Sequence, residues 1–205
     1  MRNKLQQNRL LDRDEVTLAV VADTHVPDHL PRVRTALIDR LRSMPIDMVL
    51  HAGDICVPAV LEDLACVAPV LAVRGNRDFL FWGNLNKREN LEWKGLRITL
   101  AHGHDGLWGY LVDKYFFLTR GYTFERYART LLKRNPGSQV IIFGHTHFPE
   151  NSWYNRVLFF NPGSAGVGVR GWLPPSFGIL RLKNGSVEGE IINIPEDKTF
   201  PKNDS

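Results

Sequence analysis

Cysteine is scarce in this sequence of 205 residues: only Cys56 and Cys66 are present, which excludes a disulfide framework and predicts two reduced, buried thiols. Long hydrophobic runs are also absent, since the run from Val67 to Val73 is short and interrupted by Pro69, so no transmembrane segment is expected. The basic N-terminus is not followed by the apolar block of a secretory signal. These absences predict a cytoplasmic protein.

The overall composition is that of one globular domain. Apolar residues make up 43% of the chain and charged residues 23%, which argues against disorder or a fibrous class. We expect the domain to span residues 16–194, with loose tails at 1–15 and 195–205. The formal charge of +4 suits a polyanionic partner but decides little by itself. No recognition module for nucleic acid is visible, so a nucleic acid is expected only as a substrate.

The order of elements is typical of an α/β fold. Short β-branched runs alternate with helical patterns from residue 16 onward, which predicts parallel strands and helices over 31–42 and 58–65. Later segments indicate antiparallel strands, the last two joined by Asn184-Gly185, and predict a second, antiparallel sheet. The predicted strands cover residues 16–22, 48–52, 69–73, 98–101, 140–143, 157–160, 177–182 and 187–194.

Five successive predicted strands each run into a residue that could bind a metal. Ligands of open α/β sheets lie beyond the carboxyl ends of the strands, so these residues should converge. Carboxylates, an amide oxygen and imidazoles suit Mn, Fe, Zn or Ni better than Ca. One Asp-x-His alone would more often be a satisfied loop motif, but the ordered set favours a metal site. The motifs are Asp23-Thr24-His25, Gly53-Asp54, Gly75-Asn76-Arg77-Asp78, His102-Gly103-His104 and Gly144-His145-Thr146-His147.

These motifs, together with His51-Ala52-Gly53-Asp54 and Asn161-Pro162-Gly163-Ser164, resemble the calcineurin-like metallophosphoesterases, in particular their small bacterial and archaeal phosphodiesterases. The resemblance implies two packed mixed β-sheets flanked by helices, a four-layer sandwich of the α/β class. It also implies two divalent metal ions, for which Mn is expected and Fe, Zn or Ni are alternatives. It assigns Asp23, His25 and His147 to the first metal, Asn76, His102 and His145 to the second, and Asp54 as the bridge.

The mechanism expected from such a metal pair is hydrolysis of a phosphate ester by a metal-bridging water or hydroxide. Asn76 would then lie beside the phosphate. Many family members carry a histidine after this asparagine, where it can protonate the leaving group, but here the residue is Arg77. Arginine cannot serve as a general acid, although it can clamp a phosphate; a surface salt bridge with Asp78 is the alternative. Loss of the acid favours diesters or anhydrides as substrates.

Other polar residues near the motifs have less specific expectations. His104 is a candidate proton donor or a structural histidine, and His51 is expected to be a packed strand residue. Thr24 and Thr146 should hold the backbone between ligands. Ser164 is expected to support a turn rather than act as a nucleophile, because no strand-turn-helix elbow surrounds it.

Residues 105–137 hold eight of the 21 aromatic residues and a net charge of +3, and their spacing predicts a helical hairpin broken near Gly121. Trp108 lies near the start of this insertion and is a candidate substrate contact at the rim of the metal site. Packing within the core, or between the subunits of a homodimer, is the alternative that we favour.

A phosphodiesterase is therefore the leading function, with a phosphoester substrate as the partner, and two alternatives remain. The run from Gly75 to Phe79 looks like a motif of lipid A pathway hydrolases, which favours a pyrophosphatase acting on a nucleotide-linked lipid. A non-catalytic protein-binding scaffold is the other, since the retromer subunit with this fold works through interactions. Scaffolds lose ligand residues, whereas every expected ligand is present here.

Overall fold

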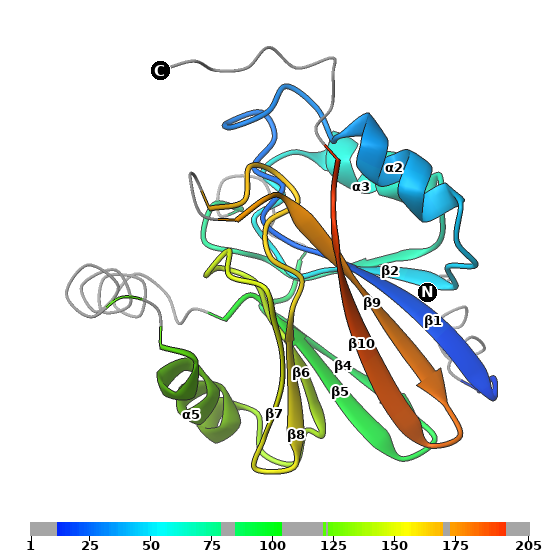
Figure 1. Ribbon diagram of the computed structural model, residues 1–205, viewed down its shortest axis with the longest axis vertical. Helices are drawn as coiled ribbons and strands as arrows, with labels where there is room; N and C mark the ends of the chain where they lie inside the picture. Colours follow the sequence, from blue (N-terminus) through cyan, green and yellow to red (C-terminus); the bar gives the residue numbers. More distant parts are fainter. Residues whose placement is uncertain (1–11, 79–84, 104–120, 122, 170–172, 196–205) are drawn as a thin grey trace.

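Two β-sheets packed face to face form the centre of the computed structural model, which describes residues 12–78, 85–103, 121, 123–169 and 173–195. Helices α2 (Thr35–Arg42) and α3 (Pro58–Ala65) cover the outer face of the first sheet, and α5 (Phe124–Arg134) covers that of the second (Figure 1). This is the four-layer arrangement of two mixed sheets that the resemblance implied.

The first sheet has five strands in the order β10-β9-β1-β2-β3. Here β1 pairs in parallel with β2 and antiparallel with β9. The strands are β1 (Glu15–Val21), β2 (Met48–His51), β3 (Val70–Ala72), β9 (Ser176–Lys183) and β10 (Ser186–Asn193).

The second sheet also has five strands, in the order β4-β5-β6-β8-β7. Parallel pairing joins β5 to β6 and β6 to β8, while β4 and β7 close the two edges in antiparallel hairpins. The strands are β4 (Arg88–Trp93), β5 (Leu96–Ala101), β6 (Val140–Ile142), β7 (Glu150–Tyr154) and β8 (Val157–Asn161).

The prediction of a separate antiparallel sheet from the C-terminal strands was therefore wrong. Strands β9 and β10 extend the first sheet, whereas β8 lies inside the second. The first five residues of β9 are buried, as are most residues of β1, so each of these strands needs neighbours that cover it on both faces. Their pairing satisfies that need, although the two strands lie far apart in sequence.

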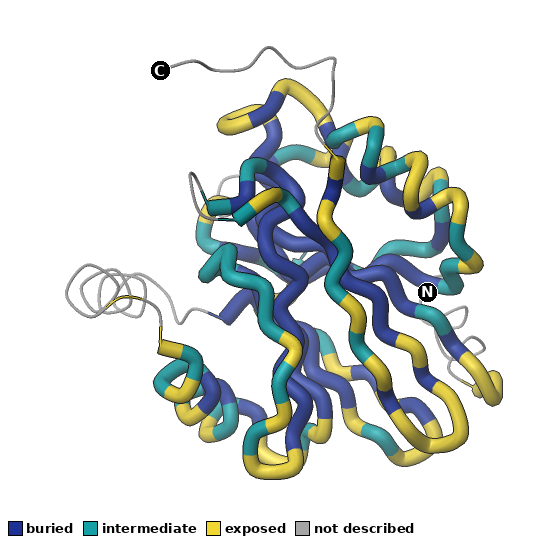
Figure 2. The backbone as a smooth tube through the Cα atoms, in the orientation of Figure 1, coloured by how far each residue is buried: buried dark blue, intermediate teal, exposed yellow. Residues whose placement is uncertain are grey.

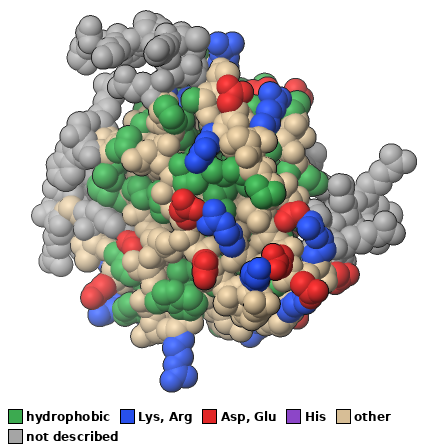
Figure 3. Space-filling model, turned by 45° about the vertical axis from the view of Figure 1, so that its right-hand side comes forward, with side chains coloured by type: hydrophobic (Ala, Val, Ile, Leu, Met, Phe, Trp, Pro, Cys, Tyr) green, Lys and Arg blue, Asp and Glu red, His purple; other side chains and the backbone are tan. Residues whose placement is uncertain are grey.

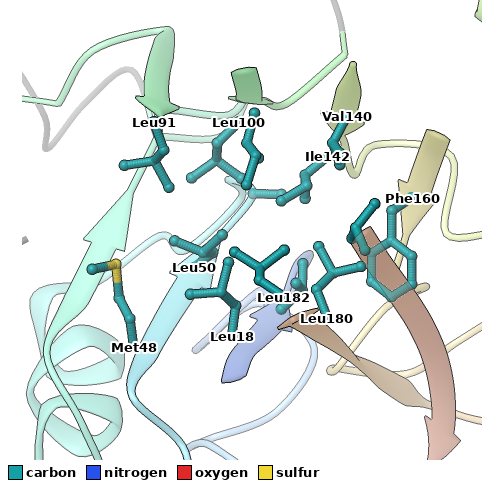
Figure 4. Close-up of a cluster of buried hydrophobic side chains, with 14 of the residues drawn as sticks. Leu18, Met48, Leu50, Leu91, Leu100, Val140, Ile142, Phe160, Leu180 and Leu182 are labelled. Atoms are coloured by element: carbon teal, nitrogen blue, oxygen red, sulfur yellow. The ribbon is translucent and has the colours of Figure 1, made fainter. Parts of the chain in front are cut away.

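Alternation of side chains along β1 divides the interior into layers. Leu18 and Val20 point into the core between the sheets, and Ala19 and Val21 point towards α2 and α3. Figure 4 shows the core between the sheets, where Leu18 and Leu50 of the first sheet face Leu100 of the second. The backbone is buried along the strand centres and exposed at the turns and outer helix faces (Figure 2). The two sheets are thereby fixed against each other.

Several boundaries differ from those expected. Helix α2 begins at Thr35 rather than Pro31, because Arg34 is extended (φ −60°, ψ 126°) and caps the helix. At the N-terminus, Arg13 pairs with Asp47, so the folded part begins before residue 16.

The two cysteines differ in exposure. Cys56 is buried as expected, but Cys66 is exposed at the end of α3. Both thiols are free.

Three tight hairpins join antiparallel neighbours, and both central residues of each turn have positive φ. The pairs are Lys94-Gly95 (46° and 81°), Asn155-Arg156 (50° and 63°) and Asn184-Gly185 (52° and 73°). Such turns match the twist of the flanking strands, and glycine or asparagine adopts them at least cost. The expected Asn184-Gly185 hairpin is confirmed, whereas Arg156 occupies a position that disfavours its side chain.

The surface shows no separation of charge on the face drawn in Figure 3, where basic and acidic side chains are interspersed with apolar ones. Exposed pairs on neighbouring strands fit this pattern, including Arg181–Glu190 at 2.8 Å and Lys183–Glu15 at 2.6 Å. No helix in the described part of the chain is long and apolar enough to cross a membrane.

Candidate metal centre

The carboxyl ends of five strands meet at one place, and the chain segments that follow them carry all seven residues expected as ligands. Asp23, Asp54 and Asn76 follow β1, β2 and β3 of the first sheet. His102 and His145 follow β5 and β6 of the second sheet. The prediction that these residues converge is confirmed, but they come from the facing ends of two sheets rather than from one.

A direct hydrogen bond connects the two sheets at this site. The Oδ2 atom of Asp23 accepts the backbone N–H of His145 at 3.0 Å. Within the first sheet, the backbone N–H groups of Asp23 and His25 donate to the carbonyls of Gly53 and Asp54, at 3.0 and 3.1 Å. The segments that carry the candidate ligands are therefore fixed to one another through the backbone.

Asp23, His25 and His147 form one group that could hold a metal ion. The Nε2 atoms of the two histidines are 3.1 Å apart, and Asp23 Oδ1 lies 3.8 Å from His25 Nε2 and 3.5 Å from His147 Nε2. Asp23 is fully buried, yet its Oδ1 accepts no hydrogen bond. A buried carboxylate oxygen without a donor is costly, and a cation would satisfy it. These residues therefore fit a metal ion.

A second group surrounds the side-chain oxygen of Asn76. This Oδ1 atom lies 3.0 Å from His102 Nε2 and 3.0 Å from His145 Nδ1. The other ring nitrogen of His102, Nδ1, is 2.7 Å from the carbonyl of Ala52. Because that carbonyl only accepts, Nδ1 carries a proton, and Nε2 is the ring nitrogen of His102 that faces Asn76 and could bind a metal. One amide oxygen and two imidazole nitrogens thus converge on one point.

Asp54 lies between these two groups. Its Oδ1 is 3.4 Å from His102 Nε2, and its Oδ2 is 3.8 Å from His25 Nε2. Each carboxylate oxygen therefore faces a different group, which is the geometry needed for a bridging ligand. Asp23 is also close to His102, at 4.0 Å, but through the same oxygen that faces His25 and His147.

The electrostatics of the site centre on these two buried carboxylates. Burial opposes the charge of Asp54, but His102 and His25 outweigh it and hold the pKa of Asp54 well below its usual range. Burial lowers the pKa of His102, but Asp54 and Asp23 raise it overall to about 9. For His25, burial prevails and lowers the pKa to about 4. The carboxylates thus attract positive charge into the site, which divalent cations would supply.

The backbone at the site adopts conformations that non-glycine residues rarely take. Five of the expected ligands have positive φ: Asp23 (52°), His25 (50°), Asp54 (58°), His145 (71°) and His147 (59°). Such residues cost free energy and persist where the surrounding structure holds them, often at functional sites. The strand-end segments are therefore held in these conformations by the fold.

Glycines next to the ligands permit close approach of the segments. A Cβ atom at Gly75 would overlap the carboxylate of Asp54. One at Gly53, whose φ is +94°, would lie 2.7 Å from His102 Nδ1. Both positions therefore require glycine.

Asp78 is the functional residue whose role the sequence did not reveal. Its carboxylate is buried and accepts four backbone N–H groups: Oδ2 from Asp54 (2.9 Å) and Gly75 (2.8 Å), and Oδ1 from Ile55 (2.9 Å) and Cys56 (2.8 Å). It thereby joins the segment after β2 to the segment after β3. The only indication of this role in the sequence is that Asp78 lies two residues after the expected ligand Asn76.

Arg77 does not pair with Asp78, contrary to the alternative considered from sequence. Its guanidinium lies 2.9 Å from Asp28, and both side chains are nearly half exposed, at 46% and 44%. Its backbone N–H donates to Asp54 Oδ1 at 2.8 Å. The main chain of Arg77 therefore positions Asp54, whereas its side chain forms a surface salt bridge.

The supporting residues lie where the sequence suggested. His51 is fully buried, and its Nε2 is 3.3 Å from the hydroxyl of Thr24, which donates to the Asp54 carbonyl. Ser164 donates to the carbonyl of Asp23 at 2.8 Å. Thr146 accepts from the amide of Asn161 at 3.0 Å. These hydroxyls hold the backbone and side chains around the site. The hydroxyl of Ser164 is engaged with the Asp23 carbonyl, in agreement with the expected structural role.

His104 and Trp108, together with the first predicted helix of the 105–137 insertion, lie outside the described residues. The second predicted helix is confirmed as α5, whose Ala128 and Leu131 pack against Phe143 and Phe159 of the second sheet. The insertion therefore supplies one outer layer of the fold, and the homodimer stays a prediction.

Comparison with known proteins agrees with this geometry. Residues 16–185 match the family model of the calcineurin-like phosphoesterase superfamily domain. A probable metallophosphoesterase of Methanothermobacter thermautotrophicus is 31% identical over 176 residues, covering 85% of this chain and 91% of that protein. A phosphodiesterase of Methanocaldococcus jannaschii is 26% identical over 169 residues, covering 80% and 91%.

Among solved structures, Vps29 of Entamoeba histolytica complexed with zinc is similar with a TM-score of 0.63 and 24% identity, over 88% of this chain and 100% of that one. This likeness concerns the fold. The two packed mixed sheets and the site at their carboxyl ends define a metallophosphoesterase type of structure. The chain belongs to the calcineurin-like phosphoesterase superfamily.

Proposed function

We propose that this protein is a phosphodiesterase that uses two divalent metal ions, with Mn as the expected ion and Fe, Zn or Ni as alternatives. Asp23, His25 and His147 would hold the first ion, Asn76, His102 and His145 the second, and Asp54 both. The observation that supports this most strongly is the buried, unpartnered Asp23 Oδ1 within a convergent set of imidazoles and carboxylates.

Divalent cations at such a site supply Lewis-acid activation of a phosphoryl group and of a water molecule near neutral pH. The chain's own residues hold the geometry. The carbonyl of Ala52 fixes the ring of His102, and the N–H of Arg77 fixes Asp54. Asp78 fixes the segments that carry Asp54 and Asn76. Rigid placement of this kind lowers the reorganisation needed during reaction.

A diester is the favoured substrate class because the residue that follows Asn76 in sequence is an arginine rather than a histidine that could act as a general acid. Arg77 stays charged at ordinary pH and cannot give a proton to a leaving group. Esters whose leaving groups are stable as anions need no such proton. Relatives named as phosphodiesterases agree with this choice.

Chelation and the Asp54→Ala variant test the proposal together. Purified protein should hydrolyse bis(p-nitrophenyl) phosphate, lose that activity on prolonged chelation, and regain it with Mn. Asp54→Ala should retain at most a few per cent of the activity and bind less metal, because it removes the ligand that faces both groups. Metal content is measured by elemental analysis of the dialysed protein.

Asp63→Ala is the matched control, since it removes an exposed carboxylate from α3, away from the site. It should keep full activity and metal content. Substantial hydrolysis by Asp54→Ala, or full activity of the chelated wild type, would refute the mechanism.

A non-catalytic scaffold is the second candidate, and the likeness to Vps29 is the observation that favours it. A scaffold would hold its fold and yet hydrolyse no monoester, diester or nucleotide diphosphate in the presence of Mn. The same panel addresses the pyrophosphatase alternative, which predicts that nucleotide diphosphates with a lipid-like group are cleaved faster than simple diesters.

A further inference from the structure

A small basic cavity adjoins the candidate metal centre. It has a volume of about 120 Å³, and its wall includes His102, itself a candidate ligand, and the adjacent Gly103. Four cationic side chains line it: Arg74, Lys87, Arg88 and Arg134. Nothing in the mechanism above uses these residues.

The fold brings the four cations together from three elements. Arg74 follows β3, and its backbone N–H donates to the carbonyl of Asn86 at 2.8 Å, which places Lys87 and Arg88 beside it. Arg88 begins β4 and pairs with Ala101, the residue before His102. Arg134 ends α5. The same ladder that positions His102 therefore positions the cationic wall.

Three of the four cations, Arg74, Lys87 and Arg88, are not balanced by acids in the part of the chain that the structure describes. None of the described residues that line the cavity is Asp or Glu. Within the described residues, Arg74, Lys87 and Arg88 form no ion pair, and the nearby Glu89 is engaged by the amide of Asn86 at 2.7 Å. Cations gathered in a concave site without acids create a potential that attracts anions.

Asn135 adds a second feature. This residue lines the cavity and is only 5% exposed. Its Nδ2 donates to the carbonyl of Leu131 at 2.8 Å. Its Oδ1 is enclosed and accepts no hydrogen bond, so a ligand in the cavity does not reach this atom. The side chain of Asn135 therefore shapes the wall of the cavity and is not itself a ligand contact.

We propose that this cavity binds a second phosphate group of the substrate. The inference rests on the proposed phosphodiesterase function, because it places the extra phosphate beside the group that is cleaved. The volume is below the roughly 300 Å³ of typical drug-sized ligand sites, so it suits one phosphate rather than a whole nucleoside. The substrate is thus a phosphoester or anhydride with at least one additional phosphate.

Three thymidine nucleotides test the proposal by calorimetric titration of the Mn-loaded protein. Thymidine 5′-monophosphate carries one phosphate, thymidine 5′-diphosphate carries two in sequence, and thymidine 3′,5′-bisphosphate carries two spaced as along a nucleic-acid strand. Wild-type protein should bind one of the two-phosphate ligands at least about tenfold more tightly than the monophosphate. If the 3′,5′-bisphosphate binds more tightly, the second phosphate belongs to a nucleic-acid strand. If the 5′-diphosphate binds more tightly, it belongs to a nucleoside oligophosphate.

Arg88→Ala should reduce this preference roughly five- to tenfold, since an exposed cation contributes less than a buried one. Arg88→Lys should restore most of it. Lys133→Ala removes a positive charge one residue from Arg134 but outside the cavity, and should leave the preference unchanged. Equal weakening of all three ligands by Arg88→Ala, or no preference in the wild type, would overturn the proposal.

Hydrolysis of bis(p-nitrophenyl) phosphate, which has a single phosphate, is measured in parallel on the same wild-type protein. Hydrolysis without any preference for two phosphates contradicts the second-phosphate site alone. Absence of Mn-dependent hydrolysis contradicts the phosphodiesterase function itself, whatever the nucleotides do.

Discussion

Asp78 shows how a single buried carboxylate can organise a site that it does not enter. Asp78→Asn replaces one of its two acceptor oxygens by an NH₂ group that would face two N–H donors. We expect a loss of about 3 kcal/mol in the free energy of unfolding, since buried donors are left unpaired. Denaturant unfolding measures it, with exposed Asp39→Asn on α2 as the control. A loss below about 0.5 kcal/mol would contradict this role.

Arg77 and Asp28 form a pair that substrate binding should break. If the guanidinium turns from Asp28 to a substrate phosphate, Arg77→Ala should raise KM about fivefold, a modest effect because the side chain is nearly half exposed. Asp28→Ala removes the competing carboxylate and should leave KM unchanged or lower it. Steady-state kinetics on a diester distinguish the cases: equal increases in KM for both variants would mean that the pair only holds the surface.

At the scale of residues, the sequence predicted the candidate metal ligands better than the residues that hold them in place. The seven candidate ligands stand at strand ends within distinct motifs, and these residues do converge. Asp78 was considered only as the partner of Arg77 in an alternative surface salt bridge. Its four backbone contacts depend on how two loops fold against each other, which no local pattern reveals.

At the scale of elements, exchanging arginine and glycine at equivalent positions of two hairpin turns tests the cost of positive φ. Arg156 has a φ of 63° in a turn where the other two hairpins place glycine. Arg156→Gly should stabilise the protein by about 1 kcal/mol, because glycine adopts this conformation without the side-chain penalty. Gly185→Arg should destabilise it by a similar amount, since a Cβ there meets no atom within 4 Å and only the backbone cost changes.

Urea unfolding of both variants measures these shifts as changes in the midpoint at constant slope. Arg156 makes no ion pair within the described residues, so removal of its side chain breaks none. A decrease in stability for Arg156→Gly would show that the entropy of the unfolded chain outweighs the relief of the turn.

The elements missed by sequence reasoning were the edges of the second sheet. Strand β4 is rich in charged residues, with only Leu91 and Trp93 buried, and β7 has no fully buried residue. Edge strands bury one face at most, so their apolar periodicity is weak. The central strands are mostly apolar and were recognised for that reason. Their assignment to sheets required long-range pairing, which short patterns do not encode.

At the scale of the whole molecule, the metal ions should fasten the two sheets together. The candidate ligands come from both sheets, so binding favours only the state in which the sheets are packed. At a free metal concentration of 100 times Kd, linkage predicts about 2.7 kcal/mol of stabilisation. Chelation should therefore lower the Tm by roughly 5–10 °C. Asp54→Ala should show no comparable shift, and an unchanged wild-type Tm would argue against this linkage.

The position of β1 in the middle of the first sheet also bears on how the chain is made. Its neighbour β9 is one of the last strands in sequence, with Val20 paired to Gly178. A nascent chain leaving the ribosome therefore carries β1 with one edge open until β9 has emerged, and exposed edges invite wrong pairing. Asp23 and His145 are 122 positions apart in sequence, so the metal site also forms only after both have emerged. We therefore expect folding to be slow, because these contacts are distant in sequence.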